Sequence, residues 1–96
     1  MGRPAARDTD MCSGHGGFYP RPNTSCSGNV FVNGLGSIRK TDTYDVHCVG
    51  SSCHPGAADS GSGTVFINGL DAMRLGDPID CGSFIAQGSK NVFIGK

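Results

Sequence analysis

The sequence predicts a small all-β protein made of short strands and Gly-rich turns. Three observations indicate this class. Among the 96 residues there are 16 Gly and no Trp, and only 36% are hydrophobic. No window shows the 3.6-residue apolar period of an amphipathic helix, and one short strand-like run occurs three times. A chain with so few apolar side chains cannot build a large core, so it normally depends on disulfides or a bound metal.

The recurring run combines β-branched and aromatic residues, which favour strands. It reads Gly-Asn-Val-Phe-Val-Asn-Gly at 28–34, Gly-Thr-Val-Phe-Ile-Asn-Gly at 63–69 and Lys-Asn-Val-Phe-Ile-Gly at 90–95. The first two runs end in Asn-Gly. This pair predicts a two-residue hairpin turn after each strand, because both residues tolerate positive φ.

A second motif places an Asp three residues after an Arg, at Arg7–Asp10, Arg39–Asp42 and Arg74–Asp77. We interpret these as ion pairs within turns and not as one basic site. If exposed, each pair would contribute only about 0–1 kcal/mol. Four or five residues after each Asp comes a side chain that can bind a metal: His15, His47 and Cys81. The coincidence predicts approximate threefold internal symmetry and a metal site.

The remaining segments (14–17, 20–22 and 50–63) are turn material rich in Gly, Pro and Ser. The chain has eight basic and eight acidic residues, so it lacks the excess of basic charge that is typical of nucleic-acid-binding proteins. No stretch approaches the roughly 20 apolar residues of a membrane-spanning helix, and no secretory signal is readable in residues 1–10. We therefore expect folding in a reducing cytoplasm, where the five Cys would serve as thiols and metal ligands and not as disulfides.

These motifs together resemble the PAAR-repeat family. The resemblance rests on Pro4-Ala5-Ala6-Arg7, the looser repeats around Arg39 and Arg74, the Asn-Gly-Leu hairpin segments, and His15-Gly16-Gly17. Because it covers nearly the whole chain, we expect one domain, 1–96, with no effector extension. The resemblance implies a short cone of β-structure with three pseudo-repeats and a metal near its vertex.

In that family three His and one Cys bind a zinc ion. The resemblance implies that the ligands here are His15, His47, His54 and Cys81, with zinc as the metal and iron as an alternative. Four protein ligands fill a tetrahedral zinc site and leave no position for substrate, so we expect a structural centre and no catalytic residue. Cys12, Cys48 and Cys53 are near these residues in the sequence, and each is an alternative ligand. Otherwise they, like Cys26, are expected to be buried free thiols.

The resemblance also implies a function. PAAR proteins cap the trimeric valine-glycine-repeat spike of type VI secretion systems, one chain per trimer. The expected role is to sharpen this spike, help pierce the target envelope with transient membrane contact, and attach effector proteins. Assembly would take place in the cytoplasm, followed by secretion on sheath contraction. The three Val-Phe runs are expected at the broad end, which faces the spike.

Three alternatives remain open from the sequence. The first is the tip of a contractile phage tail spike, located in the virion and mechanically equivalent. The second is a small Cys/His hydrolase with Cys81 or Cys53 as nucleophile and a histidine as base. The third is a disulfide-rich secreted binding module.

Overall fold

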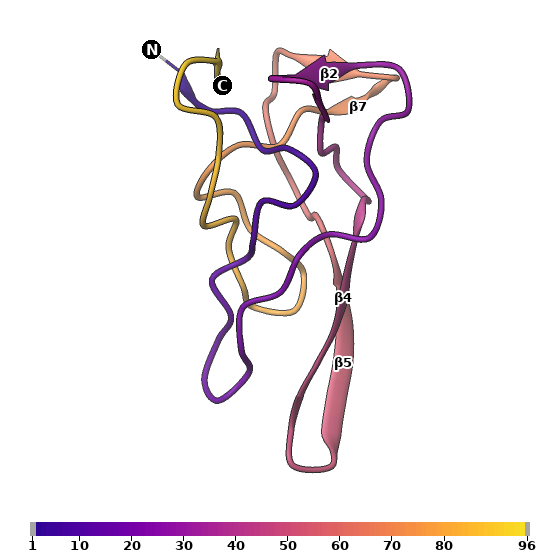
Figure 1. The fold of residues 1–96 in the computed structure, drawn as a ribbon, viewed down its shortest axis with the longest axis vertical. Helices are drawn as coiled ribbons and strands as arrows, with labels where there is room; N and C mark the ends of the chain where they lie inside the picture. The colour runs from indigo at the N-terminus through magenta and orange to yellow at the C-terminus, as the bar shows by residue number, and fades with distance from the viewer. Residues whose placement is uncertain (1, 96) are drawn as a thin grey trace.

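A computed structural model describes residues 2–95. Within this range all regular elements are strands and there is no helix, so the all-β prediction is confirmed. The molecule measures 38 × 25 × 21 Å. It is wide at one end, here called the base, and narrows toward a long hairpin at the other end, here called the tip (Figure 1). No helix able to cross a membrane occurs in the described part of the chain.

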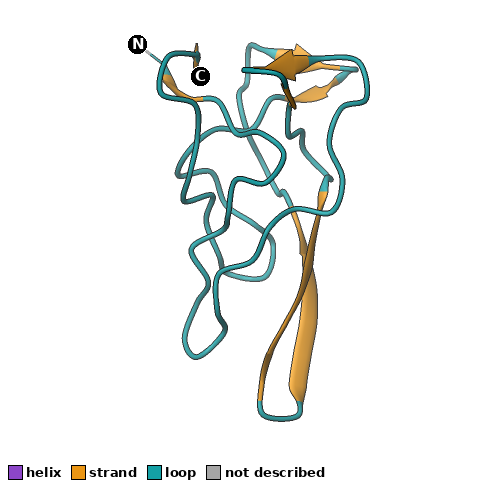
Figure 2. Cartoon of the chain, viewed as in Figure 1, coloured by secondary structure: helices purple, strands orange, loops and turns teal. Residues whose placement is uncertain are grey.

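Three antiparallel two-stranded pairs form the base (Figure 2). They are β2 (Phe31–Val32) with β3 (Leu35–Gly36), β6 (Phe66–Ile67) with β7 (Leu70–Asp71), and β1 (Arg3–Pro4) with β8 (Phe93–Ile94). The fourth pair, β4 (Thr43–Val49) with β5 (Ser52–Ala57), is the long hairpin that reaches the tip. Each of the three recurring Val-Phe runs therefore supplies one strand of the base.

The predicted Asn-Gly hairpin turns are present. Asn33 and Gly34 have φ of 54° and 78°, and Asn68 and Gly69 have φ of 54° and 80°. Two successive residues with positive φ define the tight turn whose twist matches that of the flanking strands. The third run lacks this turn, and its strand β8 pairs with β1 from the beginning of the chain.

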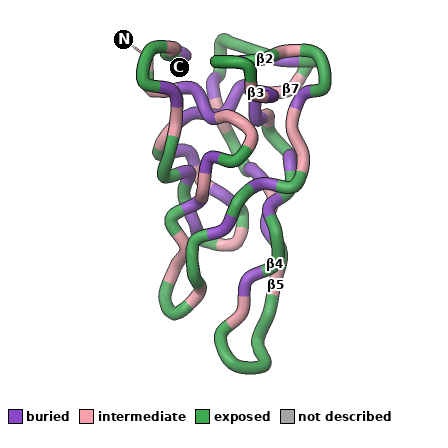
Figure 3. Tube along the Cα trace, viewed as in Figure 1, coloured by how far each residue is buried: buried purple, intermediate pink, exposed green. Residues whose placement is uncertain are grey.

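The apolar core is small and divided into two clusters. The cluster beneath the base consists of Ala5, Val32, Ile67, Ala72 and Ile94. The cluster in the middle consists of Ala6, Cys12, Ile38, Tyr44, Ala58, Met73, Ile79 and Ile85. Buried chain is concentrated in these two regions, whereas the tip of the β4–β5 hairpin is exposed (Figure 3). Apolar burial therefore stabilises the base and the middle but contributes little at the tip.

The Arg–Asp motif forms the same turn at each of its three occurrences. In the second, the Asp42 carboxylate accepts hydrogen bonds from the Arg39 backbone N–H, Nε and Nη2 at 2.7, 3.0 and 2.9 Å. The first and third turns, Arg7–Asp10 and Arg74–Asp77, repeat these three bonds at 2.9–3.1 Å. The predicted ion pairs are confirmed.

The small contribution given above for exposed pairs does not apply here, because the pairs are largely buried. The three Asp side chains are only 4–6% exposed, and the Arg side chains 9–20%. Each carboxylate accepts three charge-assisted hydrogen bonds in a largely buried setting, and such bonds are stronger than those of a surface pair. The turns therefore form part of the interior.

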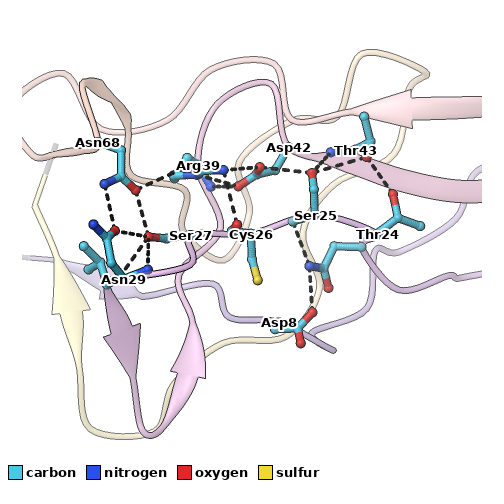
Figure 4. A network of polar contacts seen from close by, with 12 residues as sticks. Asp8, Thr24, Ser25, Cys26, Ser27, Asn29, Arg39, Asp42, Thr43 and Asn68 are labelled. Atoms are coloured by element: carbon cyan, nitrogen blue, oxygen red, sulfur yellow. Dashed lines mark hydrogen bonds and ion pairs between the residues drawn. The ribbon is translucent and has the colours of Figure 1, made fainter.

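Polar contacts join two of the three turns to a neighbouring hairpin of the base, while in the third Arg74 Nη1 donates to the backbone carbonyl of Gly95. Arg39 Nη1 donates to the side-chain oxygen of Asn68 at 3.0 Å, and the Ser27 hydroxyl donates to the same oxygen at 2.7 Å (Figure 4). In the same way, Arg7 Nη1 and the Ser89 hydroxyl donate to the side-chain oxygen of Asn33 at 3.1 and 2.6 Å. The Asn side chains thus connect the Asn-Gly turns to the Arg–Asp turns.

A disulfide joins Cys48 and Cys53 across the β4–β5 hairpin. The expectation that all five Cys are thiols or metal ligands is therefore wrong for this pair. The two-residue turn at Gly50-Ser51 places the two cysteines directly opposite each other, with Cα atoms 4.1 Å apart. Cys12, Cys26 and Cys81 are free; Cys12 is buried, while the other two are partly exposed.

The buried turn predicts a large effect of removing its carboxylate. We expect Asp42→Ala to lower the free energy of unfolding by about 3–5 kcal/mol, because it leaves a largely buried guanidinium without its counter-charge. Asp59→Ala is the control, since Asp59 is exposed, and should change it by less than about 0.5 kcal/mol. Urea denaturation of both variants measures the difference, and equal midpoints would show that the buried turn adds no stability.

The disulfide predicts a specific thiol count. Alkylation of the denatured, metal-free protein should label three cysteines before reduction and all five after it. Mass spectrometry of the intact chain counts the labels. Labelling of five cysteines before reduction would contradict the Cys48–Cys53 bond, with the Cys48→Ser, Cys53→Ser double variant as the three-thiol reference.

Candidate metal centre

The structure brings together the four residues that the sequence analysis selected. His15 follows the first Arg–Asp turn, His47 and His54 are on β4 and β5, and Cys81 follows the third turn. One donor atom from each lies within 4.8 Å of the others. Donor atoms in a tetrahedral zinc site are about 3.3–3.6 Å apart. The group can therefore hold a metal ion after small adjustments of its side chains.

The β4–β5 hairpin positions two of the four side chains. His47 and His54 are cross-strand partners, so their side chains project from the same face of the hairpin. The next pair along, Cys48 and Cys53, projects from the opposite face because side chains alternate along a strand. The disulfide thus lies behind the site, and neither of its sulfurs is among the converging donors.

A β-bulge directs His47 into the interior. The register of the hairpin shifts between Tyr44 and His47, which are three residues apart and would face opposite sides of a regular strand. With the bulge both are buried, at 2% and 0% exposure. Bulges commonly re-aim a side chain at a site in this way.

The hydrogen bonds of His47 fix which of its ring nitrogens is free. Its Nδ1 is 2.8 Å from the backbone carbonyl oxygen of Tyr19. A carbonyl only accepts, so Nδ1 carries the proton and Nε2 presents its lone pair. The Nε2 atoms of His47 and His15 approach Nε2 of His54 at 2.7 and 3.0 Å. A backbone carbonyl that holds the outer nitrogen of a ligating histidine is a common second sphere of metal sites.

The surroundings favour a neutral His54, and one aromatic ring packs against all three histidines. Desolvation, together with electrostatic interactions with His47, His15 and Arg21, lowers the pKa of His54. The neutral ring is the form that binds a metal. The Phe18 ring covers the group, with its centroid 4.8, 4.8 and 4.3 Å from those of His15, His47 and His54.

The remaining alternative ligand, Cys12, lies outside the group of converging donors. Its sulfur accepts hydrogen bonds from the backbone N–H and from Nη1 of Arg21, at 3.4 and 3.2 Å. Burial raises the pKa of the Cys12 thiol, but hydrogen bonds to the thiolate form and the charge of Arg21 outweigh burial, so its pKa is lowered. Cys12 is therefore not part of the group that could hold a metal ion.

Sequence reasoning missed one residue of this region. Arg21 is 2% exposed, and its Nη2 donates to the Cys81 sulfur at 3.4 Å. In the sequence it stands between Pro20 and Pro22, in a segment interpreted only as a turn. It has no Asp three residues later, which set it apart from the three Arg of the repeated motif. The missing Asp was the feature of the sequence that could have indicated a separate role for Arg21.

Comparison with known proteins gives one finding. The sequence model of the PAAR motif matches residues 22–87, more than half of the chain. The matched range contains His47, His54 and Cys81, whereas His15 and the literal Pro-Ala-Ala-Arg precede it. No curated protein sequence matches the chain.

The geometry predicts one bound metal ion per chain. Changing His47 to Ala or Cys81 to Ser should reduce the metal content well below one ion per chain, since each removes one of four donors. Stripping the metal from the unchanged protein should lower its unfolding free energy by about 2.7 kcal/mol or more, as for a ligand at 100 times its Kd. Elemental analysis and denaturation measure the two effects.

Cys26→Ser is the matched control for Cys81→Ser, because Cys26 is also a partly exposed free thiol but lies outside the donor group. A full complement of metal in the His47 and Cys81 variants would show that the four residues are not its ligands.

Proposed function

Because the chain belongs to the PAAR-motif family, a structural family of spike tips in contractile injection systems, we propose that it caps the trimeric valine-glycine-repeat spike of a type VI secretion system. One chain would cover the blunt end of one trimer. Its role is mechanical: it ends the spike in a narrow, rigid tip and carries out no reaction.

Three equivalent aromatic residues on the base carry this proposal. Phe31, Phe66 and Phe93 occupy the same position in β2, β6 and β8, and they are 59%, 57% and 57% exposed. The residue after each, Val32, Ile67 or Ile94, is buried. The buried residues hold the strands on the core while the rings face outward. Three similar apolar contacts at one end of a single chain suit a partner with threefold symmetry.

The base also offers backbone groups to a partner. Each of its sheets has only two strands; loops bond to backbone carbonyls of β1, β3 and β7, so the outer edges of β2, β6 and β8 are the ones on which a partner strand could pair. A trimeric spike ends in open strand edges of its own. Docking would pair the edges of both partners and cover the three phenylalanine rings.

The candidate metal centre suits the opposite end. The group borders the tip-facing end of the middle cluster, against which Cys81 packs, and three imidazoles and one thiolate can join the hairpin to two loops. We propose zinc as the metal, because zinc binds imidazole nitrogens and thiolate sulfurs, and in its structural sites all four positions come from protein. Iron would give the same architecture with a different ion. Structural zinc contributes on the order of 10–16 kcal/mol of binding free energy in small peptides.

The proposal also gives the order of events in the cell. The tip assembles on the spike in the cytoplasm and leaves with it when the sheath contracts. During passage it touches the target membrane briefly, and effectors attached to the tip or the spike travel with it. A metal-held tip would keep its shape under this load.

The docking proposal predicts the effect of charge on the base. Changing Phe31, Phe66 and Phe93 together to Glu should reduce binding to the trimeric spike by at least about 100-fold, since hot-spot aromatic residues contribute about 2 kcal/mol or more each. Calorimetry with the purified trimer measures the affinity and the ratio of one chain per trimer.

Phe84→Glu is the matched control. Phe84 is 51% exposed but belongs to none of the strand pairs of the base, so this change should leave binding intact. An unchanged affinity of the triple variant would contradict docking through the base.

A further inference from the structure

We propose that Arg21 is a positioning residue of the metal centre: its buried guanidinium holds the Cys81 sulfur and the strand that carries His47 in the arrangement the metal requires. This inference rests on the metal centre of the proposed function. It goes further by giving a role to a residue outside the donor group.

The burial of Arg21 first requires an explanation. The side chain is 2% exposed, and among the described residues the ion pairs to carboxylates involve Arg3, Arg7, Arg39 and Arg74, not Arg21. A buried charge without a counter-charge is costly. The groups around the guanidinium must therefore compensate it.

Those groups come from the segments that build the site. Nη1 donates to the Cys12 sulfur at 3.2 Å, and Nη2 donates to the Cys81 sulfur at 3.4 Å. Nε donates to the backbone carbonyl of Asp45, two residues before His47 on β4. The guanidinium carbon also lies 5.7 Å from the centre of the Tyr44 ring. One planar fork thus joins the segment before His15, the strand of His47 and the turn of Cys81.

Arg21 also lies beside the ring of His47, but this contact is not a hydrogen bond. Nη1 of Arg21 is 3.4 Å from Nδ1 of His47, but that nitrogen already donates its proton to the Tyr19 carbonyl. Arg21 therefore borders the ring without a hydrogen bond to it. The Tyr19 carbonyl sets the tautomer, and Arg21 packs against the side of the ring that faces away from the other histidines.

A missing side chain on β5 makes room for the guanidinium. A Cβ atom added to Gly56 would collide with Nη2 of Arg21 and would lie 2.9 Å from Ile79 and 3.2 Å from the Cys81 sulfur. Gly56 is not among the glycines with positive φ, so its backbone conformation does not require glycine. Glycine is required here because a larger side chain would occupy the space of the Arg21 guanidinium. This observation is independent of the hydrogen bonds.

The chemistry favours arginine at this position. A thiolate accepts hydrogen bonds from a cation, so the Cys81 sulfur can serve Arg21 on one side and a metal on the other. Only the planar guanidinium reaches three acceptors in fixed directions, whereas a lysine ammonium is a single point charge. Removal of such outer-sphere partners typically lowers metal affinity 10–100-fold.

Cobalt(II) is the reporter metal for the test, because its sulfur-to-metal charge-transfer absorption reports directly on the thiolate. We expect Arg21→Lys and Arg21→Gln to weaken cobalt binding 10–100-fold in chelator competition and to shift that absorption. Arg39→Gln is the control: it breaks a buried ion pair away from the donor group, so it lowers stability but should leave affinity and spectrum unchanged.

A second background tests whether Arg21 acts through the sulfur. Cys81→His keeps four donors but removes the thiolate, so adding Arg21→Gln to it should cost less affinity than the 10–100-fold expected in the unchanged chain. The loss that remains measures the hold of Arg21 on the His47 strand through the Asp45 carbonyl, and an equal loss in both backgrounds would show that Arg21 does not act through the sulfur. If Arg21→Gln does not fold, Arg21→Lys retains the charge and gives the same comparison. Wild-type affinity and spectrum in the Arg21 variants, or an equal loss in Arg39→Gln, would overturn this role alone. No cobalt binding by the unchanged chain would overturn the metal centre and this inference together.

Discussion

The structure depends on three buried carboxylates. Asp10, Asp42 and Asp77 each accept a backbone N–H and two guanidinium N–H groups from an Arg three residues earlier. Charged groups of this kind are stable in an interior only when their hydrogen bonds are complete. With so few large apolar side chains, the chain uses these turns as its rigid points. The strand pairs of the base and the loops that lead to the metal donors extend from them.

The means of stabilisation changes along the long axis. The base rests on a cluster of small apolar residues, and the middle on a second cluster with the buried turns beside it. Toward the tip these give way to the hairpin, its disulfide and the converging donors of His15, His47, His54 and Cys81. A tapering body has less interior at each level. Covalent and coordinate bonds act on single atoms and need no such volume, so they suit the narrow end.

Much of this could be predicted from the sequence, because repetition exposes local rules. An Asn-Gly pair after a strand-like run predicts a hairpin turn without information from the rest of the chain. The family pattern requires three histidines, and the sequence contains only three, so the pattern left little choice of ligands. The missed features depend on contacts between distant segments. Arg21 matters only because Gly56 and Cys81 lie beside it in space. The Cys48–Cys53 bond was missed because cysteine chemistry was argued from the cell compartment and not from the hairpin register. The pairing of β8 with β1 joins opposite ends of the chain, which no local pattern encodes.

The pairing of β8 with β1 affects how the protein folds while it is being synthesised. Arg3 lies opposite Ile94, so the base is closed by a contact between two strands that are far apart in the sequence and are synthesised at different times. Contacts of such long sequence separation form late and slowly. Until β8 arrives, β1 lacks its neighbour and the third phenylalanine is missing from the base. A partially synthesised chain therefore presents two corners of a three-cornered surface, and docking through the base, as proposed above, would select the chains that have been translated through Ile94.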